Sequence, residues 1–113
     1  MTAKNTMTTT PPYPVEQALK RLGANLRTAR LRRNLTIKDV AEKIGTGPRP
    51  VSDAERGKSS TSAAVYIALL WAYDLLEQMS DVGAPALDEE GLALSLFRER
   101  SRAREKKGLD SDF

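Results

Sequence analysis

The pattern of apolar positions between residues 36 and 57 predicts two short helices joined by a tight turn. Four apolar residues follow the i, i+3, i+4, i+7 spacing of one helical face: Ile37, Val40, Ala41 and Ile44. Thr36 and Asp39 stand where a capping box begins a helix, and Gly45 stands where a left-handed residue ends one. The first helix is therefore expected to begin after Thr36 and to end at Gly45.

A second short helix is expected directly after this turn. Gly47 and Pro48 fit its N-cap and first position, where the missing N–H of proline costs nothing. Val51 and Ala54 are expected to point inward, and Gly57 to end the helix. Two helices this short cannot bury enough apolar surface alone, so they need other helices around them. Together they form a helix-turn-helix signature.

The flanking sequence predicts three further helices around this pair. The first, over residues 15–33, has apolar residues on its inner face: Val15, Leu19, Leu22, Leu26 and Ala29. A helix over residues 63–73 is expected to close the core with Val65, Ala68, Leu69 and Ala72. It is apolar nearly all round, which favours a second covered side. A short fifth helix over residues 75–80 extends that apolar surface, whose members are Trp71, Leu75, Leu76 and Met79. A dimer or partner surface is the preferred interpretation, with simple core packing as the alternative.

The two ends of the chain carry weaker patterns. Residues 1–14 are rich in threonine and proline and are expected to form a disordered arm. Residues 81–107 are expected to form a linker and a C-terminal helix that begins with acids and ends with bases. Leu92, Leu94 and Leu96 also alternate as in a strand, so a strand is the alternative there. Residues 108–113 are expected to be a disordered tail. The predicted fold class is all-α, with a helix-turn-helix domain at 15–80 and a helical extension.

Composition narrows the possible functions. The 113 residues are enough for one small domain, and they include no cysteine and no histidine. Disulfides, thiolate metal sites and most nucleophilic triads are therefore excluded, and we expect no enzyme, no metal and no cofactor. No apolar run approaches the roughly 20 residues of a membrane span, and the first residues lack the apolar core of a secretory signal. A cytoplasmic protein is expected.

The charge is unevenly distributed along the chain. Residues 19–58 contain eleven Lys or Arg against four Asp or Glu, whereas residues 59–97 contain six acids and no base. The formal net charge of the whole chain is only +3. The counts by segment show that the positive charge is concentrated on the predicted helix-turn-helix. A protein that neutralises nucleic-acid phosphates shows this distribution.

Several of these residues together resemble a known family. Leu22-Gly23, Leu26-Arg27, Arg30, Leu35-Thr36, Val40-Ala41, Gly45 and Glu55-Arg56-Gly57 match the pattern of the lambda-repressor-like (XRE) DNA-binding domain. The flanking segments LGANLRTARLRRNLT, YIALLWAYDLLEQM and GLALSLFRERSRAR are similar to HipB-type antitoxins, which are encoded beside HipA-type kinase toxins. The resemblance covers residues 19–104.

The resemblance implies a five-helix fold and a homodimer on a palindromic DNA operator. It also implies autorepression and binding of a HipA-like kinase in a bacterial, nucleoid-associated setting. The residues it places toward DNA are Gly47, Arg49, Pro50, Ser52 and Asp53, with Lys38, and with Arg56 and Lys58 near phosphate. It also pairs Arg30 with Glu55 as an internal brace.

Some positions depart from the family pattern and keep alternatives open. Ile37 replaces a DNA-contacting glutamine, and Pro48 and Pro50 replace polar residues. Asp53 brings a negative charge toward DNA, where a carboxylate can accept from cytosine N4. Ala54 replaces a larger core residue. The leading hypothesis is a repressor that is also an antitoxin. A toxin-neutralising interaction module with weak DNA binding and a stand-alone phage-type repressor are the alternatives.

Overall fold

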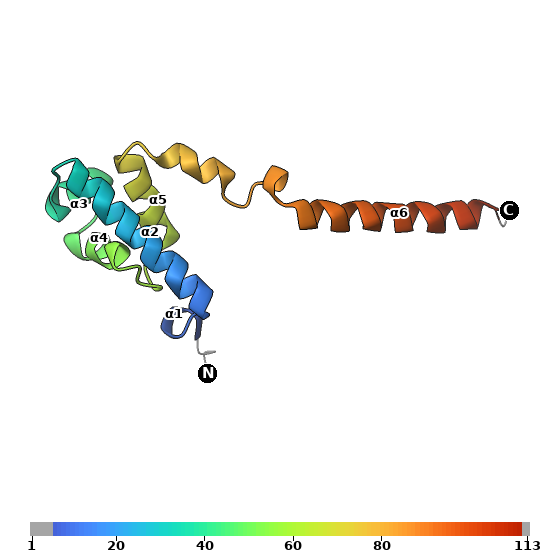
Figure 1. Ribbon diagram of the computed structural model, residues 1–113, viewed down its shortest axis with the longest axis horizontal. Coiled ribbons are helices and arrows are strands. Elements are labelled where there is room, and N and C mark those ends of the chain that lie inside the picture. Colours follow the sequence, from blue (N-terminus) through green and yellow to red (C-terminus); the bar gives the residue numbers. More distant parts are fainter. Residues whose placement is uncertain (1–5, 112–113) are drawn as a thin grey trace. The chain divides into compact units, whose positions relative to one another are not determined.

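The computed structural model describes residues 6–111, with side chains to residue 107, and divides into two compact units, Met1–Glu77 and Gln78–Phe113. The described part of the chain is all-α and contains no strand. The elements are α1 (Thr6–Thr9), α2 (Tyr13–Arg32), α3 (Ile37–Ile44), α4 (Pro48–Glu55), α5 (Ala63–Ala72), the 3-10 helices η1 (Leu76–Asp81) and η2 (Pro85–Leu87), and α6 (Glu89–Ser111) (Figure 1).

In the first unit, the short helix α4 is the central element. It packs against α2, α3 and α5, and α3 also packs against α5 (Figure 1). The most deeply buried core side chains are small and medium apolar ones together with a tyrosine: Leu26, Val40, Ala41, Val51, Ala54, Leu69 and Tyr73. Ala54 is fully buried, so its small side chain matches a close approach of the surrounding helices. Val40 and Ala41 of α3 and Val51 and Ala54 of α4 are therefore buried as their spacing predicts, whereas Ile37 and Ile44 are only half-buried.

The ends of α3 and α4 follow from local side-chain chemistry. Thr36 Oγ1 accepts from the Asp39 N–H at 3.0 Å, and the Thr36 N–H donates to Asp39 Oδ2 at 3.0 Å, which completes a capping box. These two hydrogen bonds hold the pKa of Asp39 below its usual value. Gly45 ends α3 with φ of 80°, and Pro48 follows the N-cap Gly47 at the start of α4.

Two glycines set the distance between α2 and the end of α4. A Cβ on Gly23 would lie 2.4 Å from the carbonyl oxygen of Ala54. A Cβ on Gly57 would lie 2.6 Å from the backbone of Leu19, and Gly57 has φ of 70°. Backbone therefore touches backbone at this junction, because neither residue carries a side chain. This contact sets how closely the end of α4 approaches α2.

The buried face of α5 differs from the expected one. Leu69 and Ala72 are buried as predicted, but Val65 and Ala68 are only half-buried. Tyr66, Leu70 and Tyr73, expected on another side, are buried instead. The helix is apolar nearly all round, so its periodicity does not identify the inward face. Packing against α3 and α4 decides it.

Tyr73 is fully buried beside charged groups of α2 and α4. Its hydroxyl has no hydrogen-bond partner among the described residues. Burial raises the pKa of Tyr73 to about 12, with a smaller contribution from the negative charge of Glu55. The guanidinium of Arg33 lies over the ring, 5.6 Å from its centroid, and acts in the opposite direction on this pKa.

Two cations from neighbouring helices bind the C-terminal end of α5. Arg33 Nη2 donates to the carbonyl of Tyr73 at 2.8 Å, and Lys43 Nζ donates to the carbonyl of Ala72 at 3.1 Å. Positive charge at a helix C-terminus stabilises the exposed carbonyls. The sequence pattern places Arg33 mainly outward, so this role of Arg33 is found only in the folded chain.

The described part of the N-terminal arm contains helical residues, and the boundary of the first long helix differs from the expected one. Thr6–Thr9 form one helical turn, and α2 begins at Tyr13 rather than at residue 15. Ser59 Oγ donates to the carbonyl of Thr8 at 2.6 Å and thereby ties this turn to the loop after α4. Residues 1–5 of the expected arm lie outside the described residues.

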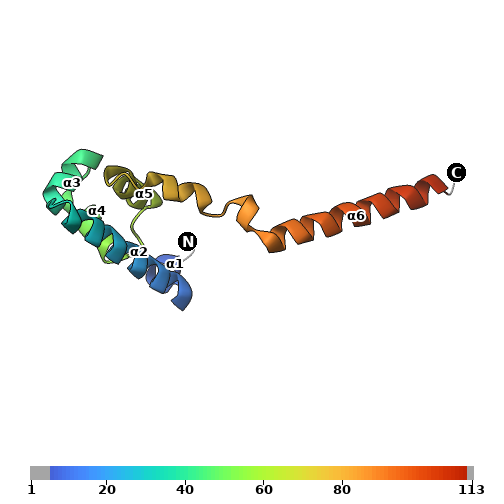
Figure 2. The ribbon, with the colours of Figure 1, turned by 45° about the horizontal axis from the view of Figure 1, so that its top comes forward.

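The second unit also departs in part from expectation. The expected fifth helix is the 3-10 helix η1, and η2 interrupts the expected linker. The C-terminal segment is one continuous helix, α6, which excludes the strand alternative (Figure 2). It runs to Ser111, so residues 108–111 are helical rather than a disordered tail, and residues 112–113 lie outside the described residues. No helix in the described part of the chain has the length and apolarity to cross a membrane.

Candidate nucleic-acid interface

The internal brace of the first unit lies between α2 and the last residue of α4. Arg30 Nε donates to Glu55 Oε2 at 2.7 Å and Arg30 Nη2 donates to Glu55 Oε1 at 3.0 Å, a bidentate pair. Arg30 Nη1 also donates to the carbonyl of Leu35 at 2.9 Å. The hydrogen bond to Glu55 raises the pKa of Arg30 above its ordinary value, against the effect of burial. Both side chains are almost fully buried, so this pair holds α4 against α2.

One exposed side of α4 forms a shallow concavity with the start of α3. Its lining residues are Ile37, Pro48, Arg49, Ser52 and Arg56. Arg49, Ser52 and Arg56 share this side because their i, i+3, i+7 spacing places them within one helical face. Arg49 is exposed at the first turn of α4, and Arg56 is exposed directly after its last turn. The concavity therefore carries a guanidinium at each end.

Pro50 and Asp53 lie at the edge of this side of α4, with Asp53 one turn after Arg49. They line a small hollow with the loop that precedes α5, residues 60–62, and with Val65. The carboxylate of Asp53 bonds Arg56 Nη2 through Oδ1 and lies 3.7 Å from Lys58 Nζ through Oδ2. The expected DNA-facing residues on α4 thus line two neighbouring hollows rather than one.

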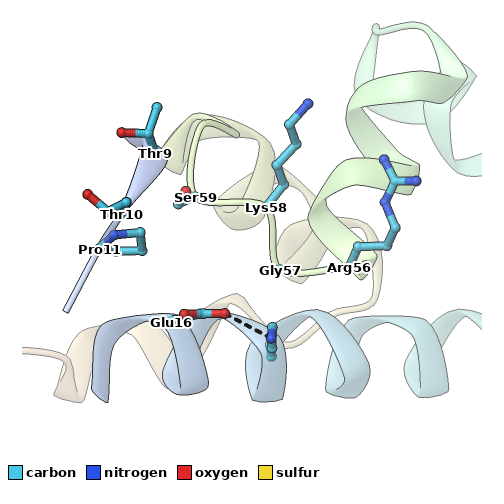
Figure 3. Close-up of a pocket in the computed structure, with 9 residues that line it drawn as sticks. Thr9, Thr10, Pro11, Glu16, Arg56, Gly57, Lys58 and Ser59 are labelled. Carbon is cyan, nitrogen blue, oxygen red and sulfur yellow. Dashed lines mark ion pairs between the residues drawn. The ribbon is translucent and has the colours of Figure 1, made fainter. Parts of the chain in front are cut away.

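The loop after α4 brings two cations next to the N-terminal turn. Gly57 and Lys58 complete a helix-ending motif in which the Lys58 N–H donates to the carbonyl of Asp53 at 3.0 Å. The hydroxyl of Tyr66 donates to the carbonyl of Lys58 at 3.0 Å and fixes this loop on α5. In Figure 3, Arg56 and Lys58 point to the same side, away from α2, and Thr9 and Thr10 lie next to Ser59. A cleft lies between the N-terminal turn, α2 and the loop after α4. An ion pair between Glu16 and Lys20, at 2.9 Å, lines its base.

The remaining expected site residues are placed as follows. Lys38 is exposed on the first turn of α3, and Gly47 is exposed at the N-cap of α4, but neither lines the concavity. Trp71 is 51% exposed and Leu76 is 39% exposed, while Leu75 and Met79 are half-buried. Lys43 Nζ lies 5.7 Å from the ring centroid of Trp71, so one face of this indole contacts a cation. The described residues include no cluster of acids that could hold a metal ion.

The comparison with known families identifies the domain that this geometry builds. Residues 21–81 match the family described as "Helix-turn-helix domain", which is more than half of the chain. The chain belongs to this helix-turn-helix family. No curated protein and no solved structure matches the chain significantly. The matched residues span α2 to η1, so the helix-turn-helix proper is α3–turn–α4 and the second helix of the motif is α4.

Membership in the helix-turn-helix family makes this protein a DNA-binding regulator, and the family is typically non-enzymatic. In such domains the second helix of the motif lies in the major groove, with its N-terminal residues at the base edges. Here that helix presents Arg49, Ser52 and the following Arg56 on one exposed side. The geometry and the family therefore point to the same surface.

Proposed function

We propose that this helix-turn-helix protein is a sequence-specific transcriptional repressor that binds its own operator as a homodimer and neutralises a HipA-like kinase toxin as its antitoxin. The observation that carries DNA recognition is the exposed side of α4 with Arg49 at one end and Arg56 at the other. Bacterial cytoplasm, in association with the nucleoid, is the proposed location.

Within this proposal the two ends of α4 have different roles. Arg49 is the only long donor at the exposed start of α4, and it reads base edges at guanine O6 and N7. Arg56 and Lys58 lie at the other end and bind phosphate, as Lys38 does from the start of α3. Ser52 donates a hydrogen bond from the concavity. Gly47, at the N-cap of α4, allows the DNA backbone to approach closely. Ile37 and Pro48 contribute apolar contact only, which limits base reading to few residues.

Two substitutions test this division of roles. Arg49→Ala should weaken binding to the cognate site by about 1–3 kcal/mol and relax base preference there. Lys58→Ala should weaken binding to cognate and to random DNA alike. It should also make the dependence of affinity on salt concentration shallower by about one unit of slope. Fluorescence titrations use duplexes from the upstream region of the gene and scrambled duplexes, at several salt concentrations.

A matched control keeps the charge count equal. Arg32→Ala removes one exposed guanidinium from the last turn of α2, outside the concavity, and should change both affinities little. Equal losses on cognate and scrambled DNA for Arg49→Ala would reduce Arg49 to a phosphate contact.

The homodimer rests on the exposed apolar residues at the end of the first unit. Ile67, Trp71 and Leu76 are all exposed there, and a tryptophan that is half exposed is unusual for a surface with no partner. Leu75 is also part of this proposed surface, and Met79, which belongs to the second unit, is proposed as a separate dimer contact. A dimer of this class sets its recognition helices about 34–36 Å apart, one turn of DNA. Sedimentation that shows a monomer at tens of micromolar protein would contradict it.

The antitoxin role rests on the resemblance of the flanking segments and on α6. Leu92, Leu94, Leu96 and Phe97 are all exposed on this helix, so it offers apolar surface to a partner. An open reading frame for a kinase beside the gene, and co-purification of the two proteins, test this role. Absence of such a gene would favour a stand-alone repressor. If DNA binding proves weak but the kinase is bound, the protein is a neutralising interaction module.

A further inference from the structure

Asp53 is placed between the two cations that the proposed DNA complex needs. Its Oδ1 bonds Arg56, and its Oδ2 lies 3.7 Å from Lys58 Nζ, so each carboxylate oxygen faces one cation. The backbone fixes this arrangement, because the Lys58 N–H donates to the carbonyl of Asp53 at 3.0 Å. The three side chains therefore form one cluster at the end of α4.

The exposure of the three groups is unequal. The Asp53 side chain is only 13% exposed, whereas Arg56 is 66% exposed and Lys58 is 45% exposed. The sheltered carboxylate thus draws on two cations whose outer surfaces remain open to solvent. An acid in the last turn of a helix is unfavourable to the helix dipole, so Asp53 does not stand there to stabilise α4. Its contacts with Arg56 and Lys58 are its only ion pairs among the described residues.

We propose that Asp53 competes with DNA phosphate for Arg56 and Lys58 and so limits the sequence-independent part of the DNA affinity. The inference rests on the proposed function, in which these two cations bind phosphate. A cation that neutralises a phosphate releases condensed counterions, and this release drives non-specific binding. Asp53 already neutralises part of the charge of both cations, so their contacts with phosphate contribute less to the DNA affinity. The ion pairs of Asp53 are with Arg56 and Lys58 and not with Arg49, so base reading by Arg49 is left unchanged.

The size of the effect follows from simple electrostatics. Asp53 forms one ion pair with each cation, and a partly exposed ion pair changes an equilibrium constant by up to about fivefold, so partial loss of both pairs on DNA binding weakens the complex by about three- to tenfold. The interaction is partly exposed, so salt should screen it. Asp53 acts on operator and random DNA equally, because phosphates are the same in both.

Asp53→Asn is the direct test, because it removes the charge and keeps the shape. In titrations on upstream and scrambled duplexes, it should tighten both complexes by about three- to tenfold at low salt and steepen the salt slope by about one unit. The matched control is Glu42→Gln, which removes the same charge from an exposed residue of α3 that forms no ion pair among the described residues. This control should have a clearly smaller effect.

A second comparison shows whether Asp53 acts through the two cations. In the background Arg56→Ala/Lys58→Ala, the gain from Asp53→Asn should fall to that of Glu42→Gln. A full gain in that background overturns the inference. A loss of affinity on both duplexes means that Asp53 orients the cations for phosphate, and a loss on the upstream duplex alone means that it reads a base. Either loss also overturns the inference.

Failure of the proposed function has a different signature. If the unmodified chain binds neither duplex above the level of the Arg56→Ala/Lys58→Ala variant, the proposed phosphate contacts are wrong. Should Asp53→Asn fail to fold, as judged by circular dichroism, the carbon-13 signal of the Asp53 carboxyl group in the unmodified chain provides the test. Competition predicts that this signal moves when DNA is added, and an unchanged signal in the bound state overturns the inference.

Discussion

Replacing Arg30 with methionine should remove the brace between α2 and α4 while keeping an apolar side chain of similar length. Arg30 donates three hydrogen bonds, two to the carboxylate of Glu55 at 2.7 and 3.0 Å and one to the carbonyl of Leu35 at 2.9 Å. The two charged side chains are only 9% and 6% exposed. Arg30→Met therefore leaves a buried carboxylate without its cation, which is more costly than the loss of the attraction itself.

The magnitude follows from this burial. Removing one partner of a buried ion pair costs about 3–5 kcal/mol, whereas a surface pair contributes only about 0–1 kcal/mol. A unit of this size has a total free energy of unfolding of about 4–12 kcal/mol. Arg30→Met should therefore remove roughly a quarter or more of it, and the melting temperature should fall by roughly 12 °C or more.

Urea denaturation followed by circular dichroism measures this loss directly. A second variant, Arg30→Met/Glu55→Leu, removes the buried charge as well and should recover most of the lost stability, since apolar replacement of both partners is often neutral. A loss below about 1 kcal/mol for Arg30→Met would refute the reasoning, because the pair would then behave as if it were at the surface. A double variant no more stable than Arg30→Met would refute the argument from the unpaired carboxylate.

Three further predictions concern packing, pH and association. Gly23→Ala should cost about 1–3 kcal/mol in urea denaturation because its Cβ would overlap backbone atoms, whereas Gly47→Ala, whose Cβ meets no atom within 4 Å, should cost less. Above pH 10 the unfolded chain ionises Tyr73 while the folded chain, with a pKa of about 12, retains the proton. Stability should therefore fall between pH 10 and pH 12, by roughly 1–3 kcal/mol at the upper end, and Tyr73→Phe should lack this part of the loss in alkaline melts. Trp71→Ala should weaken self-association in sedimentation experiments, while Leu31→Ala, at another exposed apolar residue, should not; equal effects would remove Trp71 from the dimer surface.

The sequence predicted those features of the helix-turn-helix that depend on near neighbours in the chain. The capping box of Thr36 and Asp39 and the left-handed Gly45 are set by contacts within four residues. The same is true of Gly47 and Pro48 at the start of α4. The fold class was also predictable, because these local signals agree with helical periodicity along the chain. The pairing of Arg30 with Glu55 was available only through the resemblance to a family, since 25 residues separate them.

The features that the sequence left undecided depend on which surfaces meet. The α5 helix is apolar nearly all round, so only its contacts with α3 and α4 select Tyr66, Leu69 and Leu70 for the core. The spacing of Asp53 allowed a DNA-facing role, but the loop after α4 folds back and places Lys58 beside it. Helical spacing fixes the direction in which a side chain leaves the helix axis. It does not show which other group lies in that direction.

The N-terminal turn and the glycine contact show the same division. Composition marks residues 1–14 as polar and proline-rich, yet Thr8 is held by Ser59, which lies 51 residues away in the chain. The sequence shows Gly23 only as part of a family motif. A glycine is needed at this position because the carbonyl oxygen of Ala54 leaves no room for a Cβ atom. The sequence alone therefore determined the helices, their caps and the distribution of charge, because these are local properties. The tertiary structure decided the core face of α5, the approach of α4 to α2 and the partner of Asp53, because long-range packing brings together groups that no local pattern relates.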